Sequence, residues 1–225
     1  MRRRQQTLNR ARGRIYSVIT ADLVESRQIV DRANAQERLS RIVKTLNAKL
    51  AQALVAPFMV TLGDEIQGML GDVRETQAAV AGIHGVFHPR EISIGIGVGP
   101  IATKLARRVT EMDGPAFLNS RTALEIAKKK RLEVVVQTGD VRADDILNAV
   151  YSLVVGIKAR WTKTQWQRVN LYRELETVEG VARRLGVTKQ SVSKSLRNTL
   201  WLRVLDAETK LPRIFLAGPG AALKA

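Results

Sequence analysis

The chain has 225 residues, of which 45% are apolar and 26% charged, a composition that excludes a disordered or fibrous protein. It contains no cysteine, which excludes disulfides, thiol catalysis and cysteine-based metal centres. No apolar run is long enough to cross a membrane, and the basic residues 1–6 lead into no apolar stretch of a secretory signal. We therefore expect a cytoplasmic protein without membrane association.

The formal net charge is +16, and the excess positive charge lies at the two ends of the chain. Residues 1–14 hold six arginines and no acid, for +6, and residues 161–225 hold 12 basic and 5 acidic residues, for +7. The middle, residues 15–160, therefore carries 16 − 6 − 7 = +3. A nearly balanced body between a basic N-terminal arm (1–14) and a basic C-terminal part indicates a polyanionic partner, most commonly nucleic acid. The alternative is a proteome that is basic throughout.

Hydrophobic periodicity predicts the secondary structure in chain order. The first elements are a strand at 15–21, a helix at 34–54, a strand at 57–62, a tight turn at 63–65, a returning strand at 66–70, a helix at 73–86 and a strand at 91–99. A helix at 116–130, a strand at 132–138 and a helix at 143–160 follow. The opening β-α-β-β-α-β order is typical of a ferredoxin-like palm, a sheet with antiparallel strands and helices on one face. We expect an α/β (α+β) palm-like domain over 15–160 and, beyond a boundary near Arg160, an all-α domain over 161–225.

Three acidic residues lie at one edge of this sheet, either at the end of a predicted strand or in the turn between two strands. Asp22 ends the first strand, and Asp64 and Glu65 form the turn of the hairpin that lies beside it in a palm. Converging carboxylates repel one another unless a cation neutralises them, and Mg²⁺ or Mn²⁺ would do so and bring nucleotide phosphates along. We expect these three residues to hold the metal; the alternative is that they only cap a strand and make a turn.

Other polar residues are candidate nucleotide contacts. Ser26 and Arg27 follow Asp22 in the loop where phosphates would lie, although that loop could simply be exposed. Asp113 precedes a Gly-Pro turn and could line the same edge. Glycines at 95, 97 and 99 leave one face of a strand without side chains, for the approach of either a base or a tightly packed helix.

Residues 178–197 carry the pattern of a helix-turn-helix. Ala182 allows two helices to cross closely, Gly186 permits a left-handed turn, and Val187 and Val192 fill the space between the helices. Thr188 is a good N-cap for the second helix. The alternative is a helical dimerisation module that shares this pattern by coincidence.

The exposed face of the second helix then supplies the contacts with double-stranded DNA. The candidate residues are Lys189, Gln190, Ser191, Ser193, Lys194 and Arg197. Gln190 and Ser191 lie near the helix start, where they could read base edges in the major groove, while the cations contact phosphates. Trp161, Trp166 and Trp201 are expected in the core rather than stacked on bases.

Three segments resemble the SatD family: VITADLVESR at 18–27, PFMVTLGDEIQG at 57–68 and DGPAF at 113–117. The resemblance runs from about Ile15 to Trp201 and implies a helix-turn-helix behind the first domain. More distantly, that domain is similar to nucleotide cyclases, in which aspartates at the positions of Asp22 and Asp64 hold two metal ions. Leu62 replaces the first glycine of the diguanylate cyclase signature, and Asn119 and Arg121 lack the spacing of the class III cyclase pair. Cyclase activity is therefore not carried over.

Together these features predict a DNA-binding transcription regulator whose palm domain binds a divalent metal and a nucleotide as a sensor. The alternatives are a metal-dependent enzyme that acts on nucleoside triphosphates and a palm that serves only as a scaffold. A homodimer is expected, because helix-turn-helix proteins often read two-fold sites and the related cyclases assemble their site between subunits.

Overall fold

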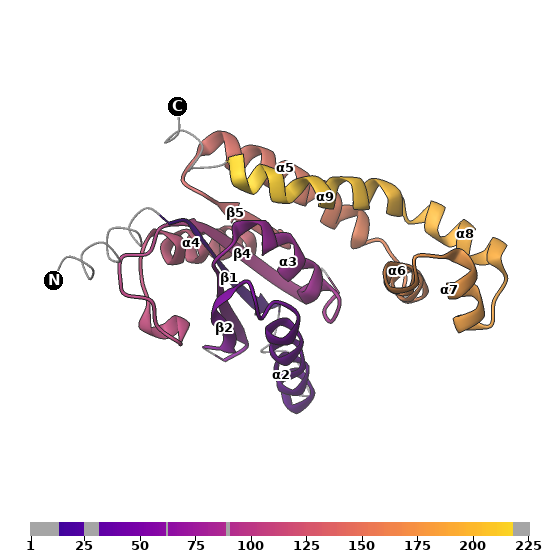
Figure 1. Ribbon diagram of the computed structural model, residues 1–225, viewed down its shortest axis with the longest axis horizontal. Coiled ribbons are helices and arrows are strands. Elements are labelled where there is room, and N and C mark those ends of the chain that lie inside the picture. The colour runs from indigo at the N-terminus through magenta and orange to yellow at the C-terminus, as the bar shows by residue number, and fades with distance from the viewer. Residues whose placement is uncertain (1–13, 25–31, 62, 89–90, 218–225) are drawn as a thin grey trace.

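The computed structural model describes residues 14–24, 32–61, 63–88 and 91–217, and over these the protein is a mixed α/β fold (Figure 1). Five strands form one sheet in the order β2-β3-β1-β4-β5. They are β1 (Tyr16–Leu23), β2 (Leu54–Val60), β3 (Glu65–Leu70), β4 (Ile92–Gly99) and β5 (Val134–Gln137). β1 pairs antiparallel with β3 and β4, and β5 joins β4 in parallel after a helical crossover. Prediction and structure agree in the type and order of these elements.

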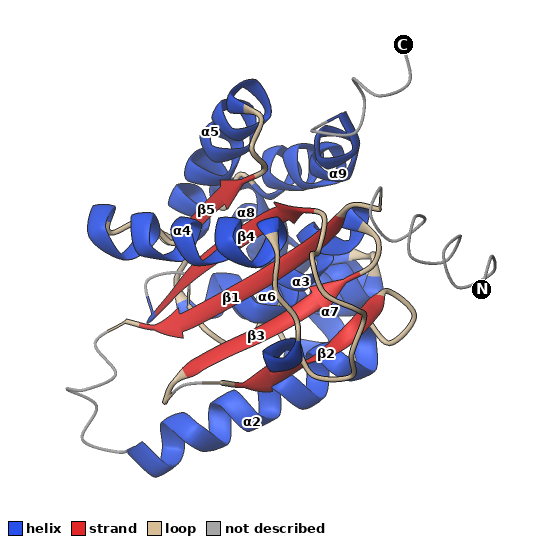
Figure 2. Cartoon of the chain, turned by 90° about the vertical axis from the view of Figure 1, so that its left-hand side faces the viewer, coloured by secondary structure: helices blue, strands red, loops and turns tan. Residues whose placement is uncertain are grey.

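Figure 2 shows the helices among the described residues. They are α2 (Arg32–Lys49), α3 (Thr76–His84), α4 (Pro115–Lys130), α5 (Val141–Lys158), α6 (Lys163–Leu175), α7 (Val178–Leu185), α8 (Lys189–Asn198) and α9 (Trp201–Ala217), with 3-10 turns η2 (Val73–Glu75) and η4 (Val109–Glu111). Helices α3, α4 and α5 lie within three residues of the predicted ranges, whereas α2 ends at Lys49 rather than at the predicted residue 54. None of these helices is both long and apolar enough to span a membrane.

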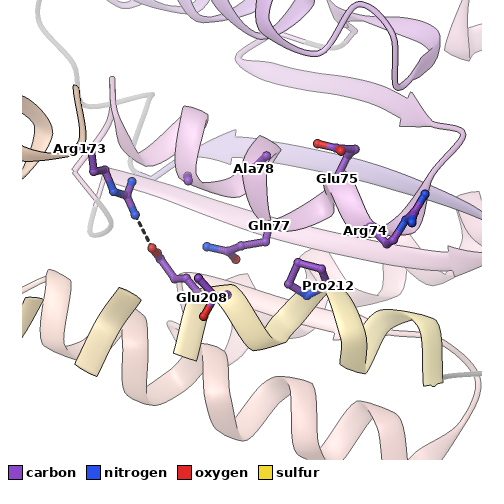
Figure 3. A pocket seen from close by; sticks show the side chains of 9 residues that line it. Arg74, Glu75, Gln77, Ala78, Arg173, Glu208 and Pro212 are labelled. Atoms are coloured by element: carbon purple, nitrogen blue, oxygen red, sulfur yellow. Dashed lines mark hydrogen bonds and ion pairs between the residues drawn. The ribbon is translucent and has the colours of Figure 1, made fainter. Parts of the chain in front are cut away.

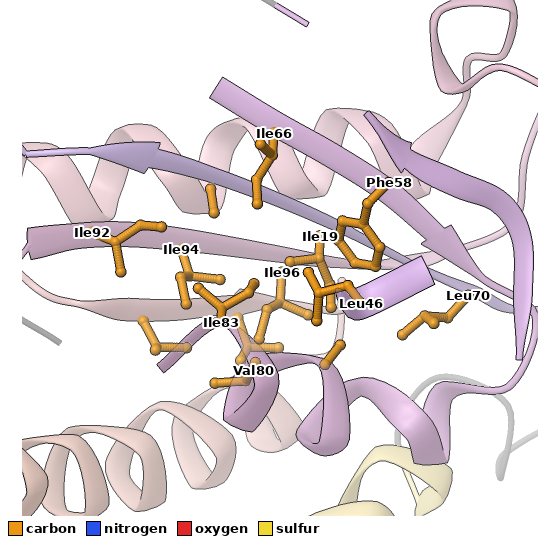
Figure 4. Close-up of a cluster of buried hydrophobic side chains, with 14 of the residues drawn as sticks. Ile19, Leu46, Phe58, Ile66, Leu70, Val80, Ile83, Ile92, Ile94 and Ile96 are labelled. Atoms are coloured by element: carbon orange, nitrogen blue, oxygen red, sulfur yellow. The ribbon is translucent and has the colours of Figure 1, made fainter. Parts of the chain in front are cut away.

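One face of the sheet builds the main core with α2 and α3 (Figure 4). Alternate residues of the strands, such as Ile19, Ile94 and Ile96, are fully buried there against Leu46 and Val80 from the helices. Each such side chain contributes roughly 1.5–3 kcal/mol when it leaves water. The apolar side chains at every second position of the strands therefore pack in one layer with those that recur every 3.6 residues along the helices.

The other face is covered by α4, which lies against the glycines of β4. A Cβ atom at Gly97 would stand 2.1 Å from the backbone oxygen of Ala116, and one at Gly95 would stand 2.4 Å from that of Ser120. Thr20 on β1 and Ser120 share a hydrogen bond of 2.8 Å across this contact. The alternating glycines thus make room for a helix backbone, the second of the two interpretations of this pattern.

Helix α9 connects the C-terminal helices to the sheet domain. Its first part, with Trp201 and Val204, packs in a cluster with Trp161 and the helix α6. Its last part places Leu211 and Phe215 in the main core of the sheet. The predicted boundary near Arg160 falls in the turn between α5 and α6, but α9 contacts both sides of it. The three tryptophans pack edge to face, as expected of core residues.

A buried charge cluster fixes this junction. Glu208 of α9 is ion-paired with Lys158 at the end of α5 and with Arg173 of α6. Lys158 and Glu208 are 2% and 5% exposed, so breaking the pair would leave an uncompensated buried charge. Burial lowers the pKa of Lys158, because desolvation penalises its charged form more than Glu208 favours it.

His84 at the end of α3 makes the stability of the fold pH-dependent. Its side chain is buried, neither ring nitrogen has a hydrogen-bond partner among the described residues, and burial lowers its pKa well below 6.5, helped by the nearby cations Lys158 and Arg173. Folded His84 therefore stays neutral while the unfolded chain gains a proton below about pH 6.5. This contribution to stability is present above that pH and is lost as the pH falls.

We predict that the free energy of unfolding falls between pH 7.5 and pH 5.5 by about 1 kcal/mol more in the wild type than in His84→Leu. Urea unfolding at the two pH values measures the difference. Equal falls in the two proteins would show that His84 takes up its proton without unfolding.

Candidate functional site

Two of the three acidic residues expected at the edge of the sheet, Asp22 and Glu65, lie directly opposite each other in the β1–β3 ladder. Glu65 is buried, and Arg121 of α4 donates to both of its carboxylate oxygens, at 2.7 and 3.1 Å. The hydroxyl of Thr61 donates to Glu65 Oε1 at 3.0 Å. Such a two-pronged pair is among the stronger ionic contacts available to a carboxylate.

Asp22 is neutralised from the same helix. Lys128 Nζ lies 2.5 Å from Asp22 Oδ2, and Lys128 stands seven residues after Arg121, two turns along the same side of α4. Arg121 and Lys128 thus supply the positive charge that we expected a metal ion to supply. Asp64 is half-buried in the hairpin turn, which Gly63 makes possible with a φ of 59°.

The carboxylates as arranged do not make a metal centre. Both oxygens of Glu65 are engaged by Arg121, and Asp22 would have to exchange Lys128 for the ion. Across the part of the chain that the structure describes, no three His, Asp or Glu residues stand close enough together to hold a metal. Binding of Mg²⁺ or Mn²⁺ by Asp22, Asp64 and Glu65 stays a prediction.

Of the candidate nucleotide contacts, the structure describes Asp113, which does not lie at this edge. Gly99 pairs with Tyr16 at the far end of β4 from the Asp22–Ser93 pair, and Asp113 lies at that far end, where its carbonyl accepts from Ala102. The carboxylate of Asp113 accepts from the backbone of Gly114 at 2.7 Å and starts the turn into α4. Ser26 and Arg27 lie outside the described residues.

Helices α7 and α8 occupy the segment whose sequence predicts a helix-turn-helix, 178–197. Gly186 ends α7 in the left-handed conformation, with φ 64° and ψ 33°, and the N–H of Val187 donates to Ala182 at 3.0 Å. Val181, Ala182 and Val192 are buried between the helices, while Val187 remains 36% exposed in the turn and does not fill the space assigned to it.

A threonine immediately precedes each of the helices α6, α7 and α8. Thr162, Thr177 and Thr188 accept hydrogen bonds from the first turns of α6, α7 and α8, and Thr162 completes a capping box with Gln165. The caps fix where each helix begins, and so which side of α8 faces outward.

The outward side of α8 carries most of the predicted DNA contacts. Lys189, Gln190, Lys194 and Arg197 are exposed, and Ser193 is half-exposed. Ser191 turns toward α6, where its hydroxyl and carbonyl oxygens accept from Arg168 at 3.1 and 3.2 Å. Lys189 is paired with Glu179 of α7 at 3.1 Å, and this contact lowers the pKa of Glu179. An exposed pair of this kind exchanges partners at little cost.

Residues 180–205 contain no Asp or Glu and six cations, which are Arg183, Arg184, Lys189, Lys194, Arg197 and Arg203. Arg183 and Arg184 close α7 and are both exposed, although they were not among the predicted DNA contacts. The acid-free run was the sequence signal that could have identified them. It makes α8 and the last turn of α7 positive, while Glu179 in the first turn of α7 pairs with Arg183 and Lys189.

A separate open pocket of about 610 Å³ lies between η2, α3 and α9 (Figure 3). Arg74, Gln77, Arg173 and Glu208 are among the residues that line it, and the side-chain oxygen of Gln77 is buried with no hydrogen-bond partner among the described residues. The pocket is on the sheet face that packs against α3, opposite the face that holds Arg121 and Glu65. No predicted site residue lines it.

Comparison with known proteins identifies the family. The model of the SatD family matches residues 16–210, and the chain belongs to this family. No curated protein matches the sequence.

We predict that Arg121→Ala lowers the free energy of unfolding by about 2 kcal/mol, because it leaves the buried Glu65 unpaired while Arg121 itself is half-exposed. Chemical denaturation measures this value. The double variant Arg121→Ala/Glu65→Gln should recover most of the loss, and an equally unstable double variant would contradict the pairing argument.

Proposed function

We propose that this SatD-family protein is a cytoplasmic transcription regulator that binds double-stranded DNA through α7 and α8. The geometry of the two helices carries the proposal: a left-handed turn at Gly186, a shared apolar contact, and an outward α8 surface without acids. An α-helix with its side chains is about 10–12 Å across, and the major groove is about 12 Å wide, enough to admit the ten-residue α8.

Some of the outward-facing side chains of α8 are proposed to contact base edges, and the others to contact phosphates. Gln190, Ser193, Lys194 and Arg197 recur at three- and four-residue spacing and so share one side of α8. The carboxamide of Gln190 can pair with an adenine edge, while the cations meet phosphates. Ser191 is proposed to contribute through its hydroxyl proton, since Arg168 already uses its oxygen. Arg183 and Arg184 join the phosphate contacts.

We further propose that the sheet domain is a ferredoxin-like palm that acts as a sensor for a nucleotide with Mg²⁺ or Mn²⁺. The strand order β4-β1-β3-β2 and the pairing of Asp22 beside the hairpin turn support this assignment. A bound divalent ion would supply charge for phosphate binding, with Asp22 and Asp64 as its ligands after Lys128 releases Asp22. Because Arg121 and Lys128 already neutralise two carboxylates, a palm that serves only as a scaffold is the competing proposal.

For DNA binding, we predict that the wild type prefers one selected sequence over a scrambled duplex. Gln190→Ala should lose about 1–3 kcal/mol of that preference, because one base edge is no longer read. Lys194→Ala should weaken binding to both duplexes alike and reduce the salt dependence of affinity by about one counterion. Fluorescence anisotropy at several salt concentrations measures both effects.

Lys210→Ala is the matched control, since it removes an exposed cation from α9, outside the proposed interface. It should bind like the wild type. A preference that persists in Gln190→Ala would remove α8 from its proposed reading role.

For the sensor, we predict that Mn²⁺ with a nucleoside triphosphate raises the melting temperature of the wild type but not of Asp64→Asn. Lys128→Met should show the larger shift, because Asp22 is then free for the metal. A thermal-shift screen of the four triphosphates with and without metal tests this. No shift in wild type or Lys128→Met would support the scaffold.

A further inference from the structure

The outer side of α5 is apolar and uncovered over the described residues. Leu153 is 70% exposed and Ile146 is 52% exposed, and Ala149 and Gly156 beside them are also exposed. The opposite side of the helix is fully used, because Leu147, Tyr151, Val154 and Val155 are buried in the main core and at the junction.

This surface also lacks charge. Residues 146–157 contain no Asp, Glu, Lys or Arg, although 26% of the chain is charged and the net charge is +16. A solvent-facing side of a helix ordinarily carries charged residues. Without cations, the surface offers nothing to DNA or to the headgroups of an anionic lipid bilayer. Its chemistry fits an apolar helix surface that is itself uncharged.

The four outer residues share one side of the helix and alternate in size. Ile146, Ala149, Leu153 and Gly156 are spaced by three, four and three residues, in the order large, small, large, small. This spacing reads the same in both directions about position 151. A two-fold axis at that level would set Ile146 against Gly156 of a second copy, and Ala149 against its Leu153. Each large side chain then meets a small one, so the surface is complementary to itself.

Gly156 supports the same arrangement independently. A Cβ atom added there would meet nothing within 4 Å, and the backbone is not in the left-handed region that requires glycine. A glycine inside a helix costs about 1 kcal/mol relative to alanine. The described residues of the single chain give no packing reason for it, whereas a second helix that approaches closely does.

We propose that two copies of this chain associate through α5, antiparallel and about a two-fold axis level with residue 151. The contact buries Ile146 and Leu153, whose packing against small residues resembles ridges seated in grooves. At the rim, the exposed Arg142 and Arg160 come opposite each other across the axis, and each copy is itself basic. Added salt therefore screens a repulsion and strengthens the association.

The test is sedimentation velocity of the full chain at micromolar concentration, with variants matched for exposure. The wild type should be a dimer that tightens as salt is raised. Leu153→Glu should raise its dissociation constant by about tenfold or more, because a carboxylate is desolvated in the contact. Leu202→Glu, at a leucine 72% exposed on α9, should leave the dimer intact.

Gly156→Leu distinguishes the proposed helix pair from non-specific hydrophobic association. It enlarges the apolar surface and improves helix propensity, so the free energy of unfolding of the monomer should not fall, yet it should weaken the dimer because it clashes with Ile146 of the second copy. A monomeric wild type would overturn the proposal, as would a dimer that survives Leu153→Glu or is strengthened by Gly156→Leu. A monomer that binds some other protein through α5 would also overturn it.

Discussion

The carboxylate of Glu208 is the contact on which the arrangement of the two halves depends. It is one buried acid that holds a buried lysine from α5 and an arginine from α6, so three helices are locked at one point. Removing charges from water is expensive, and the cluster is tolerable only when all its members are in place. For this reason the C-terminal helices have a defined orientation relative to the sheet. Any change in the sheet domain that displaced α9 would act on this cluster and, through Arg173 of α6, on the helices proposed to bind DNA.

A second constraint comes from the close approach of α4 to β4. Because Gly95 and Gly97 have no side chains, the helix lies on the strand backbone, and this proximity brings Arg121 and Lys128 within reach of Glu65 and Asp22. The same packing that stabilises the sheet thus supplies the cations that pair with Asp22 and Glu65 at its acidic edge. Any divalent ion that enters must compete with these two cations of the protein.

Much of the fold could be predicted from the sequence, because its strong signals are local. Alternation in the strands, Gly186 at the turn and threonine caps before α6, α7 and α8 all depend on neighbouring residues. The partners of the acidic residues could not be predicted in this way, since the pairing of Glu65 with Arg121 joins residues 56 positions apart and depends on the docking of α4. For the same reason, Asp113 could not be placed at the far end of β4, nor α9 across the predicted domain boundary. The structure was also needed to decide between the two interpretations of the glycines in β4, because a packed helix and a bound base require the same empty space.

The central claim is that α8 reads DNA sequence, and selection from a random duplex library with the wild-type protein tests it most directly. Selection at raised salt weakens the phosphate contacts that every sequence shares and leaves the base contacts to discriminate. The account predicts enrichment of one short sequence, repeated with two-fold symmetry if two copies bind together. Recovery of a library that remains random after repeated rounds would contradict it.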